Sequence, residues 1–436
     1  MVKHFYFPKK NVILFSNLHC EVFEADRKMG SIMADIKDFK RNQFLAEKEK
    51  STDKERPSLN SQIARHRVLT FYRLCIVAAI VAGIVIFAYF DWKNTVYSDY
   101  VVQQQYDWTK SSEARCMNLN GTLFTYSKDG MSCTDNRGRA IWNQTYEMQN
   151  PIVRTCRNVV AVGDYNGRMI YVSNTEGNMG TIDTTMPIRD FCVAENGVVA
   201  AVLDDSNVTA IYLYNVSGEE LIYFKTTMSK SGYPLAIAIS NDGKQVAVSY
   251  LKAENGKMST SVGFYNFSSV GQNYTDNLVG GYGYANAIVP VVEFMNSENS
   301  FAVADDRLML YQGRQKPENI ANIMIDKEIQ SVFFNENHVG LVFYNMTGET
   351  TYSLELYDPS GKKEQTINFN QEYKEILLRT EGIIIYNDEE CVIFDWEGKK
   401  KYEGAFKERI ECIIPTGNIA RYTVVTSDSI QMIELQ

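Results

Sequence analysis

Histidine and proline are scarce in this sequence. Few histidines limit the metal-binding and catalytic sites that the chain can form, and few prolines favour a fold rich in strands. The 436 residues include 4 His and 9 Pro. No His-x-x-x-His or Cys-x-x-Cys pair occurs, so a zinc site built from His and Cys is not expected. A Gly-x-Ser-x-Gly motif is also missing, which argues against the nucleophile turn of an α/β-hydrolase. His338, the one His after position 66, is therefore interpreted as a packed side chain rather than a ligand.

Basic residues are few over most of the chain. Residues 1–73 hold 15 Lys and Arg against 9 Asp and Glu, which leaves 29 basic and 44 acidic residues for the remainder. The net charge is thus about +6 before the first long apolar run and about −15 in the rest of the chain. An acidic domain repels phosphates, so no nucleic-acid partner is expected.

A single long apolar run separates these two parts. Residues 74–90 (LCIVAAIVAGIVIFAYF) carry no charge, and a helix of this length spans about 25 Å, near the hydrocarbon thickness of a bilayer. Arg65, Arg67 and Arg73 precede the run, and positive charge on the cytoplasmic side predicts a cytoplasmic N-terminus and an extracytoplasmic C-terminal domain. The residues expected inside the membrane are Leu74, Ile76, Val77, Ile80, Val81, Ile84, Val85, Ile86 and Phe87.

Two alternatives to a membrane anchor are open. A cleaved signal peptide would need a shorter basic region and a better cleavage site than Ala88-Tyr89-Phe90, and a buried core helix seldom runs this long without a polar residue. The sequence predicts a single-pass cell-membrane protein. Its parts are a doubtful N-terminal extension (1–33), a charged cytoplasmic tail (34–67), a transmembrane signal-anchor helix (68–92), a linker (93–113) and an extracytoplasmic domain (114–436).

The region after position 100 contains an internal repeat. A strand, a turn of Asn or Asp with Gly, and a second strand recur, as in 136–138 (NRG), 215–218 (NVSG) and 395–398 (DWEG). The glycines at 138, 177, 218, 271, 313, 361 and 398 are separated by 39, 41, 53, 42, 48 and 37 residues. About 40 residues is the length of a four-stranded propeller blade. Glycine suits its hairpins because it adopts positive φ without a steric penalty.

Short β-branched runs predict the inner strands of the blades. They lie at 159–163, 198–203, 245–250, 301–304, 339–344 and 382–386. We expect an all-β propeller of about eight blades, with seven possible. Its Asp-Gly turns resemble those of TolB-like and quinoprotein-like propellers, a similarity of fold only. The last unit, 410–435, lacks one strand, which 100–106 would supply to close the ring. A stacked β-solenoid is the alternative, although its repeats are shorter.

Candidate ligand sites are few. Six Cys after the apolar run permit disulfides, but their irregular spacing favours buried free thiols. Asp- and Asn-rich turns are interpreted as ordinary turns rather than calcium loops. Residues 280–286 (GGYGYAN) combine glycines with tyrosines, which would suit a ligand loop with Tyr282, Tyr284 and Asn286 as contacts. The alternative is a plain insertion in the fourth blade. No catalytic, cofactor-binding or metal-binding residue is identified.

Five stretches resemble one family. They are 65–73 (RHRVLTFYR), 139–146 (RAIWNQTY), 196–203 (NGVVAAVL), 348–357 (GETTYSLELY) and 424–435 (VVTSDSIQMIEL). On these stretches the chain resembles an uncharacterised domain-of-unknown-function family of membrane-anchored β-propeller proteins from Clostridia-like Gram-positive bacteria. The resemblance covers roughly residues 33–436 and implies a start near Met33. It carries no assigned activity and no functional residues.

Two functional hypotheses follow from these observations. The first is a non-catalytic binding or scaffolding module that holds a protein, peptide or glycan at the cell surface, without a cofactor. The second is a propeller enzyme that acts on glycans through carboxylates clustered at the centre of the ring, because paired carboxylates perform acid and base catalysis on sugars.

Overall fold

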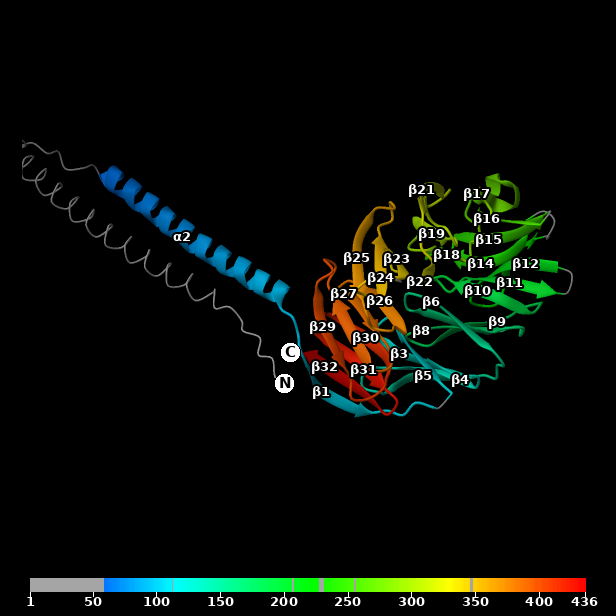
Figure 1. Cartoon of the computed structure of the whole chain (residues 1–436), viewed down its shortest axis with the longest axis horizontal. Helices are drawn as coiled ribbons and strands as arrows, with labels where there is room; N and C mark the ends of the chain where they lie inside the picture. The colour runs from blue at the N-terminus through cyan, green and yellow to red at the C-terminus, as the bar shows by residue number, and fades with distance from the viewer. Residues whose placement is uncertain (1–58, 112, 206–207, 227–230, 255, 346–347) are drawn as a thin grey trace, which may run out of the picture. The chain divides into compact units, whose positions relative to one another are not determined.

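The computed structural model describes residues 59–436 except 112, 206–207, 227–230, 255 and 346–347. The chain divides after Asn94 into two units, a helical one and a β-propeller (Figure 1). The extension predicted at 1–33 and most of the tail predicted at 34–67 lie outside the described residues.

The helical unit contains α2 (Leu59–Asn94), which is longer than the predicted span of 68–92. Its segment His66–Phe90 is long and apolar enough to cross a membrane. All nine residues predicted to lie in the membrane are more than half exposed, from 54% at Val81 to 74% at Phe87. Water is a poor solvent for so much apolar surface, and a membrane span or a signal sequence would present such a surface.

The second unit is an eight-bladed propeller, and each blade is a four-stranded antiparallel sheet. This confirms the predicted fold class and the larger of the two predicted blade numbers. Blades 1 to 7 are built from consecutive strands (β2–β5 through β26–β29), whereas blade 8 has the order β30, β31, β32, β1.

The first strands of the blades line the central channel, and at five places around the ring neighbouring first strands contact one another. The first strands are β2 (Arg115–Leu119), β6 (Pro151–Cys156), β10 (Ile188–Val193), β14 (Tyr233–Ile239), β18 (Val291–Phe294), β22 (Ile329–Phe334), β26 (Glu375–Arg379) and β30 (Ile410–Asn418). The second strands are β3 (Thr122–Tyr126), β7 (Val159–Asp164), β11 (Val199–Asp205), β15 (Gln245–Glu254), β19 (Asn299–Val303), β23 (Val339–Tyr344), β27 (Gly382–Tyr386) and β31 (Arg421–Thr426).

The third and fourth strands form the outer half of each blade. The third strands are β4 (Gly130–Thr134), β8 (Met169–Asn174), β12 (Val208–Tyr214), β16 (Lys257–Asn266), β20 (Arg307–Gln312), β24 (Tyr352–Tyr357), β28 (Glu390–Phe394) and β32 (Ser429–Leu435). The fourth are β5 (Ala140–Thr145), β9 (Asn178–Asp183), β13 (Glu220–Thr226), β17 (Leu278–Ala285), β21 (Glu318–Met324), β25 (Lys363–Phe369), β29 (Lys400–Ala405) and β1 (Tyr100–Asp107). Two short 3-10 helices, Gly271–Asn273 and Thr275–Asn277, precede β17.

The core consists of eight apolar clusters, one between each pair of neighbouring blades in the described part of the propeller. Strand β7 shows how the sequence achieves this. Val159 and Ala161 pack against blade 3, whereas Val160 and Val162 pack against blade 1. Because successive side chains of a strand point to opposite faces, a strand buried on both faces must be apolar throughout. The predicted inner strands are therefore confirmed as the second strands of their blades.

The predicted Asn/Asp–Gly turns join the third strand to the fourth. Asp395 is typical: its Oδ1 accepts the N–H groups of Glu397 (3.0 Å) and Lys399 (2.9 Å), and Gly398 follows at φ 78°. Asp135, Asn215 and Asp358 make the same pair of bonds in their blades. The acceptor side chain fixes the turn and glycine supplies its left-handed residue.

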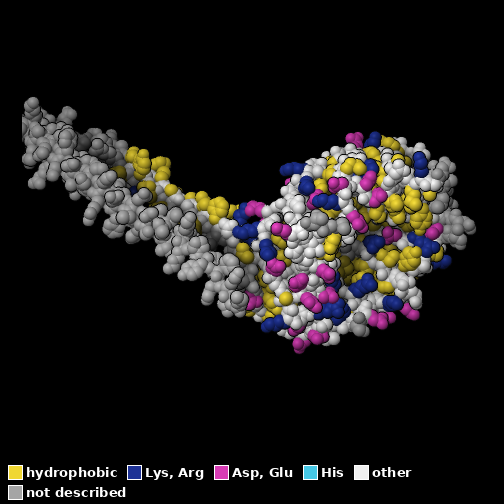
Figure 2. Space-filling view, in the orientation of Figure 1, with side chains coloured by type: hydrophobic (Ala, Val, Ile, Leu, Met, Phe, Trp, Pro, Cys, Tyr) yellow, Lys and Arg dark blue, Asp and Glu magenta, His cyan; other side chains and the backbone are white. Residues whose placement is uncertain are grey.

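The direction of the strands alternates within each blade, so two of the three turns of a blade lie at the same end of the ring. In an antiparallel blade the turn after the first strand and the turn after the third strand lie at the same end. We call this end the channel-mouth face; it carries, among others, Asn120, Arg157, Glu195, Asn337 and Trp396. Acidic and basic side chains are interspersed over the visible surface of the propeller (Figure 2).

Candidate functional site

A cavity of about 1110 Å³ opens at the channel-mouth face. First strands of blades 1 to 7 and the turns that follow them form its wall. Six of its lining residues are asparagines: Asn118, Asn120, Asn158, Asn241, Asn335 and Asn337. An amide side chain both donates and accepts hydrogen bonds. The wall therefore suits a hydrated polar ligand better than a lipid.

Arg157, in the turn between β6 and β7, links three blades at this mouth. Its Nη1 donates to Glu195 Oε2 of blade 3 at 2.9 Å, and its Nη2 lies 2.8 Å from Glu336 Oε1 of blade 6. In an eight-bladed ring blade 6 stands opposite blade 2, so the ion pair with Glu336 crosses the mouth, whereas the pair with Glu195 joins neighbouring blades. Its φ of 54° is a conformation that costs a non-glycine residue about 1 kcal/mol or more.

The corresponding turns of other blades use glycine for this conformation. Gly121, Gly197 and Gly243 have φ values of 87°, 80° and 72° in blades 1, 3 and 4. Glycine adopts such angles without strain. The strained arginine in blade 2 is therefore held by its ion pairs and brings a cationic group over the cavity.

Deeper in the channel, carboxyl groups from two blades approach one arginine. Arg154 Nη2 of β6 lies 2.7 Å from Asp190 Oδ1 of β10. Glu293 of β18 faces the same group of residues. Burial raises the pKa of Glu293 to about 7, Arg154 opposes this shift and Asp190 adds to it. A carboxyl group that titrates near neutral pH thus interacts electrostatically with the ion pair of Arg154 and Asp190.

Two thiols, Cys156 and Cys192, also line this cavity. Burial raises the pKa of Cys156 to about 11 and that of Cys192 well above its ordinary value. A thiol is a much poorer nucleophile than a thiolate. All cysteines that the structure describes are free, and these two are expected to be chemically inert at neutral pH.

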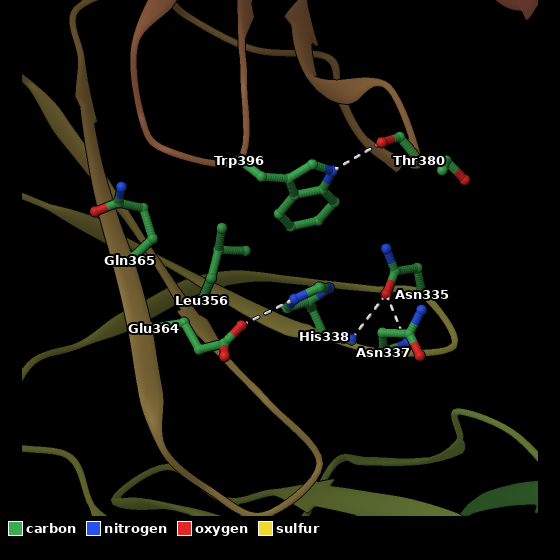
Figure 3. Close-up of a pocket in the computed structure, with 8 residues that line it drawn as sticks. All are labelled: Asn335, Asn337, His338, Leu356, Glu364, Gln365, Thr380 and Trp396. Atoms are coloured by element: carbon green, nitrogen blue, oxygen red, sulfur yellow. Dashed lines mark hydrogen bonds and ion pairs between the residues drawn. The ribbon is translucent and has the colours of Figure 1, made fainter. Parts of the chain in front are cut away.

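A second pocket of about 310 Å³ lies between blades 6 and 7 beside the channel mouth (Figure 3). We call it the Trp396 pocket. Its lining residues are Asn335, Asn337, His338, Leu356, Glu364, Gln365, Thr380 and Trp396. Three of them, Asn335, Asn337 and Thr380, also line the channel cavity, so the two hollows adjoin one another.

Aromatic stacking and hydrogen bonds fix the centre of this pocket. The rings of His338 and Trp396 stack with centroids 4.3 Å apart and 24° between their planes (Figure 3). His338 Nε2 lies 3.1 Å from Glu364 Oε2, and the Trp396 indole N–H donates to the carbonyl of Arg379 at 3.0 Å. His338 is thus a packed side chain, as predicted, and it also forms part of a pocket wall.

The prediction of a ligand loop at 280–286 is wrong about the structure of this segment, most of which is a strand. Tyr282 and Tyr284 belong to strand β17, which pairs with β16 along its length. The Tyr282 hydroxyl donates to the carbonyl of Pro317 at 2.8 Å, and the buried Tyr284 hydroxyl bonds to that of Tyr311 at 2.6 Å. Asn286 follows the strand at φ 55°. The two tyrosines anchor an outer strand and are not a free binding surface.

The residues that form the two cavities escaped the sequence-based prediction. Arg157, Glu293 and Trp396 lie in different blades, and no spacing rule brings them together. One signal was available for Trp396. It occupies the second position of a repeated turn where other copies have Asn136, Val216 or Pro359, and a large aromatic residue in such a turn is unusual.

Comparison with known proteins identifies a family and a fold. A model described as a family of unknown function (DUF5711) matches residues 93–435. No curated protein matches the chain. Among solved structures, BamB from Moraxella catarrhalis is 9% identical with a TM-score of 0.46, and the match covers 77% of this chain and 100% of that chain.

Two further solved structures show comparable similarity. Sqt1 from Chaetomium thermophilum is 12% identical with a TM-score of 0.49, covering 77% of this chain and 98% of that one. Dipeptidyl peptidase 4 from Porphyromonas gingivalis is 12% identical with a TM-score of 0.49, covering 75% of this chain and 58% of that one. These similarities concern the fold alone.

Proposed function

The chain belongs to a family of unknown function (DUF5711), and on that premise we propose that it is a non-catalytic binding or scaffolding module anchored in the cell membrane. Its ligand is a peptide or a glycan that enters the channel mouth. The observation that carries this proposal is the cavity of about 1110 Å³ with its polar and charged wall. Ligand sites are typically preformed hollows of this kind with polar groups placed in their walls.

The exposed apolar surface of α2 supports the membrane anchor. Its segment His66–Phe90 has the length and composition of a membrane span, and the positive charge at its N-terminal side favours a cytoplasmic N-terminus with the propeller outside. Protease treatment of intact cells that express the chain with a tag at each end tests this topology. Loss of the C-terminal tag alone supports it, and protection of that tag until lysis contradicts it.

We expect Thr155→Trp to abolish ligand binding without unfolding the propeller. Thr155 is an exposed residue of β6 in the cavity wall, so an indole there projects into the channel, narrows it and displaces no core side chain. The full chain, in a detergent without sugar, is offered labelled cellulose-type and chitin-type oligosaccharides and an array of short peptides. Thr145→Trp, at an exposed position of the outer strand β5, is the matched control.

Either of two results would contradict the proposal. One is the absence of any oligosaccharide or peptide that binds the wild-type chain. The other is equal binding by wild type and Thr155→Trp, because the ligand would then lie outside the channel mouth.

A second candidate function is glycan hydrolysis, and Glu293 favours it. Its pKa of about 7 suits a general acid, and the carboxyl group of Asp190, which pairs with Arg154, would be the second carboxyl group of the site. Glycosidases use such a pair of carboxyl groups. If this function holds, the wild-type chain releases shorter products from the oligosaccharides and Glu293→Gln releases none. Intact oligosaccharides after prolonged incubation with the wild type would leave binding as the function.

Glu293 also predicts how stability depends on pH. Its pKa is raised from 4.5 in the unfolded chain to about 7 in the folded one, so the folded state binds the proton more tightly. The contribution of protonated Glu293 to the free energy of unfolding is therefore complete below pH 4.5 and is lost as the pH rises to 7. We expect the wild type to lose about 1–3 kcal/mol over this range relative to Glu293→Gln, measured by urea unfolding at each pH. Parallel curves for the two chains would contradict this prediction.

A further inference from the structure

We propose that the Trp396 pocket binds one neutral pyranose unit of a glycan, whose remaining units extend into the channel mouth. This inference rests on the proposed function and names the ligand class for it. The pocket and the channel cavity share Asn335, Asn337 and Thr380, so one chain of sugars can occupy both. A volume of about 310 Å³ suits a single sugar ring and is too small for a folded domain.

The pocket has a rigid aromatic wall. The Trp396 indole N–H donates to the carbonyls of Arg379 (3.0 Å) and Thr380 (3.2 Å), so the ring is fixed by its own blade. His338 stacks on it, and the fully buried Leu356 supports the pocket wall from the core without exposing surface of its own. A flat apolar wall of this kind matches the C–H face of a pyranose, and its prior ordering lowers the entropy lost on binding.

The polar groups of the pocket match hydroxyl groups. Within the described part of the chain, the side chains of Asn337 and Thr380 make no hydrogen bond, and neither do Gln365 Nε2 or Glu364 Oε1. These groups comprise both donors and acceptors. Each sugar hydroxyl also donates and accepts, so a pyranose can pair with all of them.

Charge and hydrogen bonding disfavour other occupants. Glu364 is the one acidic residue among the lining residues, and no Lys or Arg is among them, so a phosphate or an acidic sugar would be repelled. A Lys or Arg side chain of a peptide would satisfy Glu364. Its side chain carries donors only, however, and itself offers no acceptor to the amide donors of Asn337 and Gln365. A neutral pyranose is therefore the better match.

The test uses the full chain in a lipid nanodisc or in a detergent without sugar. The probes are the methyl glycosides of glucose, galactose, mannose and N-acetylglucosamine, followed by saturation-transfer NMR and by tryptophan fluorescence. We expect a saturable response to at least one glycoside, weakened about tenfold or more in Trp396→Ala and about threefold in Gln365→Ala. Gln365 is a partly exposed residue of β25, so its variant tests the pocket even if Trp396→Ala fails to fold.

Trp142→Ala is the matched control. The Trp142 indole also donates to a backbone carbonyl, that of Asn174 at 3.0 Å, but it does not line the pocket, so we expect unchanged binding. Equal weakening in both tryptophan variants would overturn the inference, as would no response to any glycoside. A response to N-acetylarginine amide alone would also overturn it and would assign the pocket to a basic side chain.

The outcomes separate this inference from the proposed function. If a longer oligosaccharide binds the wild type, is excluded by Thr155→Trp and is unaffected by Trp396→Ala and Gln365→Ala, the pocket assignment fails and the channel-mouth function stands. If no oligosaccharide or peptide binds at all, both fail.

Discussion

Deletion of residues 97–107 is expected to abolish the folded propeller. Strand β1 is the fourth strand of blade 8, and Tyr100–Val102 and Gln104–Asp107 oppose residues of β32. At about 1 kcal/mol net for each backbone hydrogen bond, the loss is about 5 kcal/mol or more, which approaches the whole stability of a typical domain. Thermal unfolding followed by circular dichroism, with gel filtration, measures the effect.

A peptide with the sequence of 97–107 provides the control for this deletion. Most of β1 is exposed and the strand is polar (YVVQQQYD), so the peptide should be soluble. Added in excess, it should pair with the vacant edge of β32 and restore the thermal transition, while a scrambled peptide should not. A truncated chain that unfolds at the wild-type temperature without the peptide would show that ring closure does not depend on β1.

Glu355→Ala is expected to lower the free energy of unfolding by about 2–3 kcal/mol. Glu355 in β24 is 6% exposed, accepts the Tyr357 hydroxyl at 2.7 Å and lies 3.1 Å from both Lys327 Nζ and Lys363 Nζ. The variant leaves the hydroxyl of the buried Tyr357 without its acceptor, whereas the two lysines can turn to solvent. Urea unfolding at neutral pH measures the loss.

The effect of Glu355 depends on pH in a defined direction. Burial disfavours its ionisation, yet the hydrogen bonds from Tyr357, Lys363 and Lys327 lower its pKa below the ordinary 4.5. Its contribution is therefore present above pH 4.5 and is lost as the pH falls through the lowered pKa. The difference in the free energy of unfolding between the wild type and Glu355→Ala should therefore become smaller at acidic pH.

The exposed ion pair of Lys400 and Glu403 supplies a matched comparison. Glu403→Ala should change stability by less than about 0.5 kcal/mol, because exposed ion pairs contribute little. An equal loss in the two alanine variants would contradict the role assigned to burial.

Much of the fold could be predicted because its signals are local and repeated. A run such as Val159–Val162 is buried on both faces, so its composition identifies an inner strand. The turn around Gly398 needs a residue at positive φ, and the sequence supplies it at regular intervals. The ring-closing strand could be inferred because the last repeat is one strand short.

The glycine-rich segment 280–286 shows where local signals fail. Glycine favours loops over strands, yet Gly280 and Gly283 pair with Phe264 and Ser261 of β16. The long neighbouring strand and the bond between Tyr284 and Tyr311 outweigh the low strand preference of the glycines. Tertiary contacts of this kind are invisible in a single segment.

The candidate site could not be predicted for a related reason. Arg157 and Glu336 are 179 positions apart and meet across the mouth, and neither has a distinctive sequence context. The strained φ of Arg157 and the raised pKa of Glu293 are properties of the assembled ring. Composition and spacing describe a blade, whereas the site is formed by the arrangement of several blades.

The position of β1 also sets an order of events during synthesis. The ribosome makes β1 before every other strand of the propeller and makes its partner β32 last; Gln103 and Glu434, which bond to each other, are 331 positions apart. At roughly 5–20 residues per second, β1 waits about 15–65 s for its partner. During that time blades 1 to 7 can form behind it, but the ring stays open until β32 has been made. The three consecutive glutamines in the middle of β1 interrupt its apolar residues, so the waiting strand has no long apolar run to offer to other nascent chains.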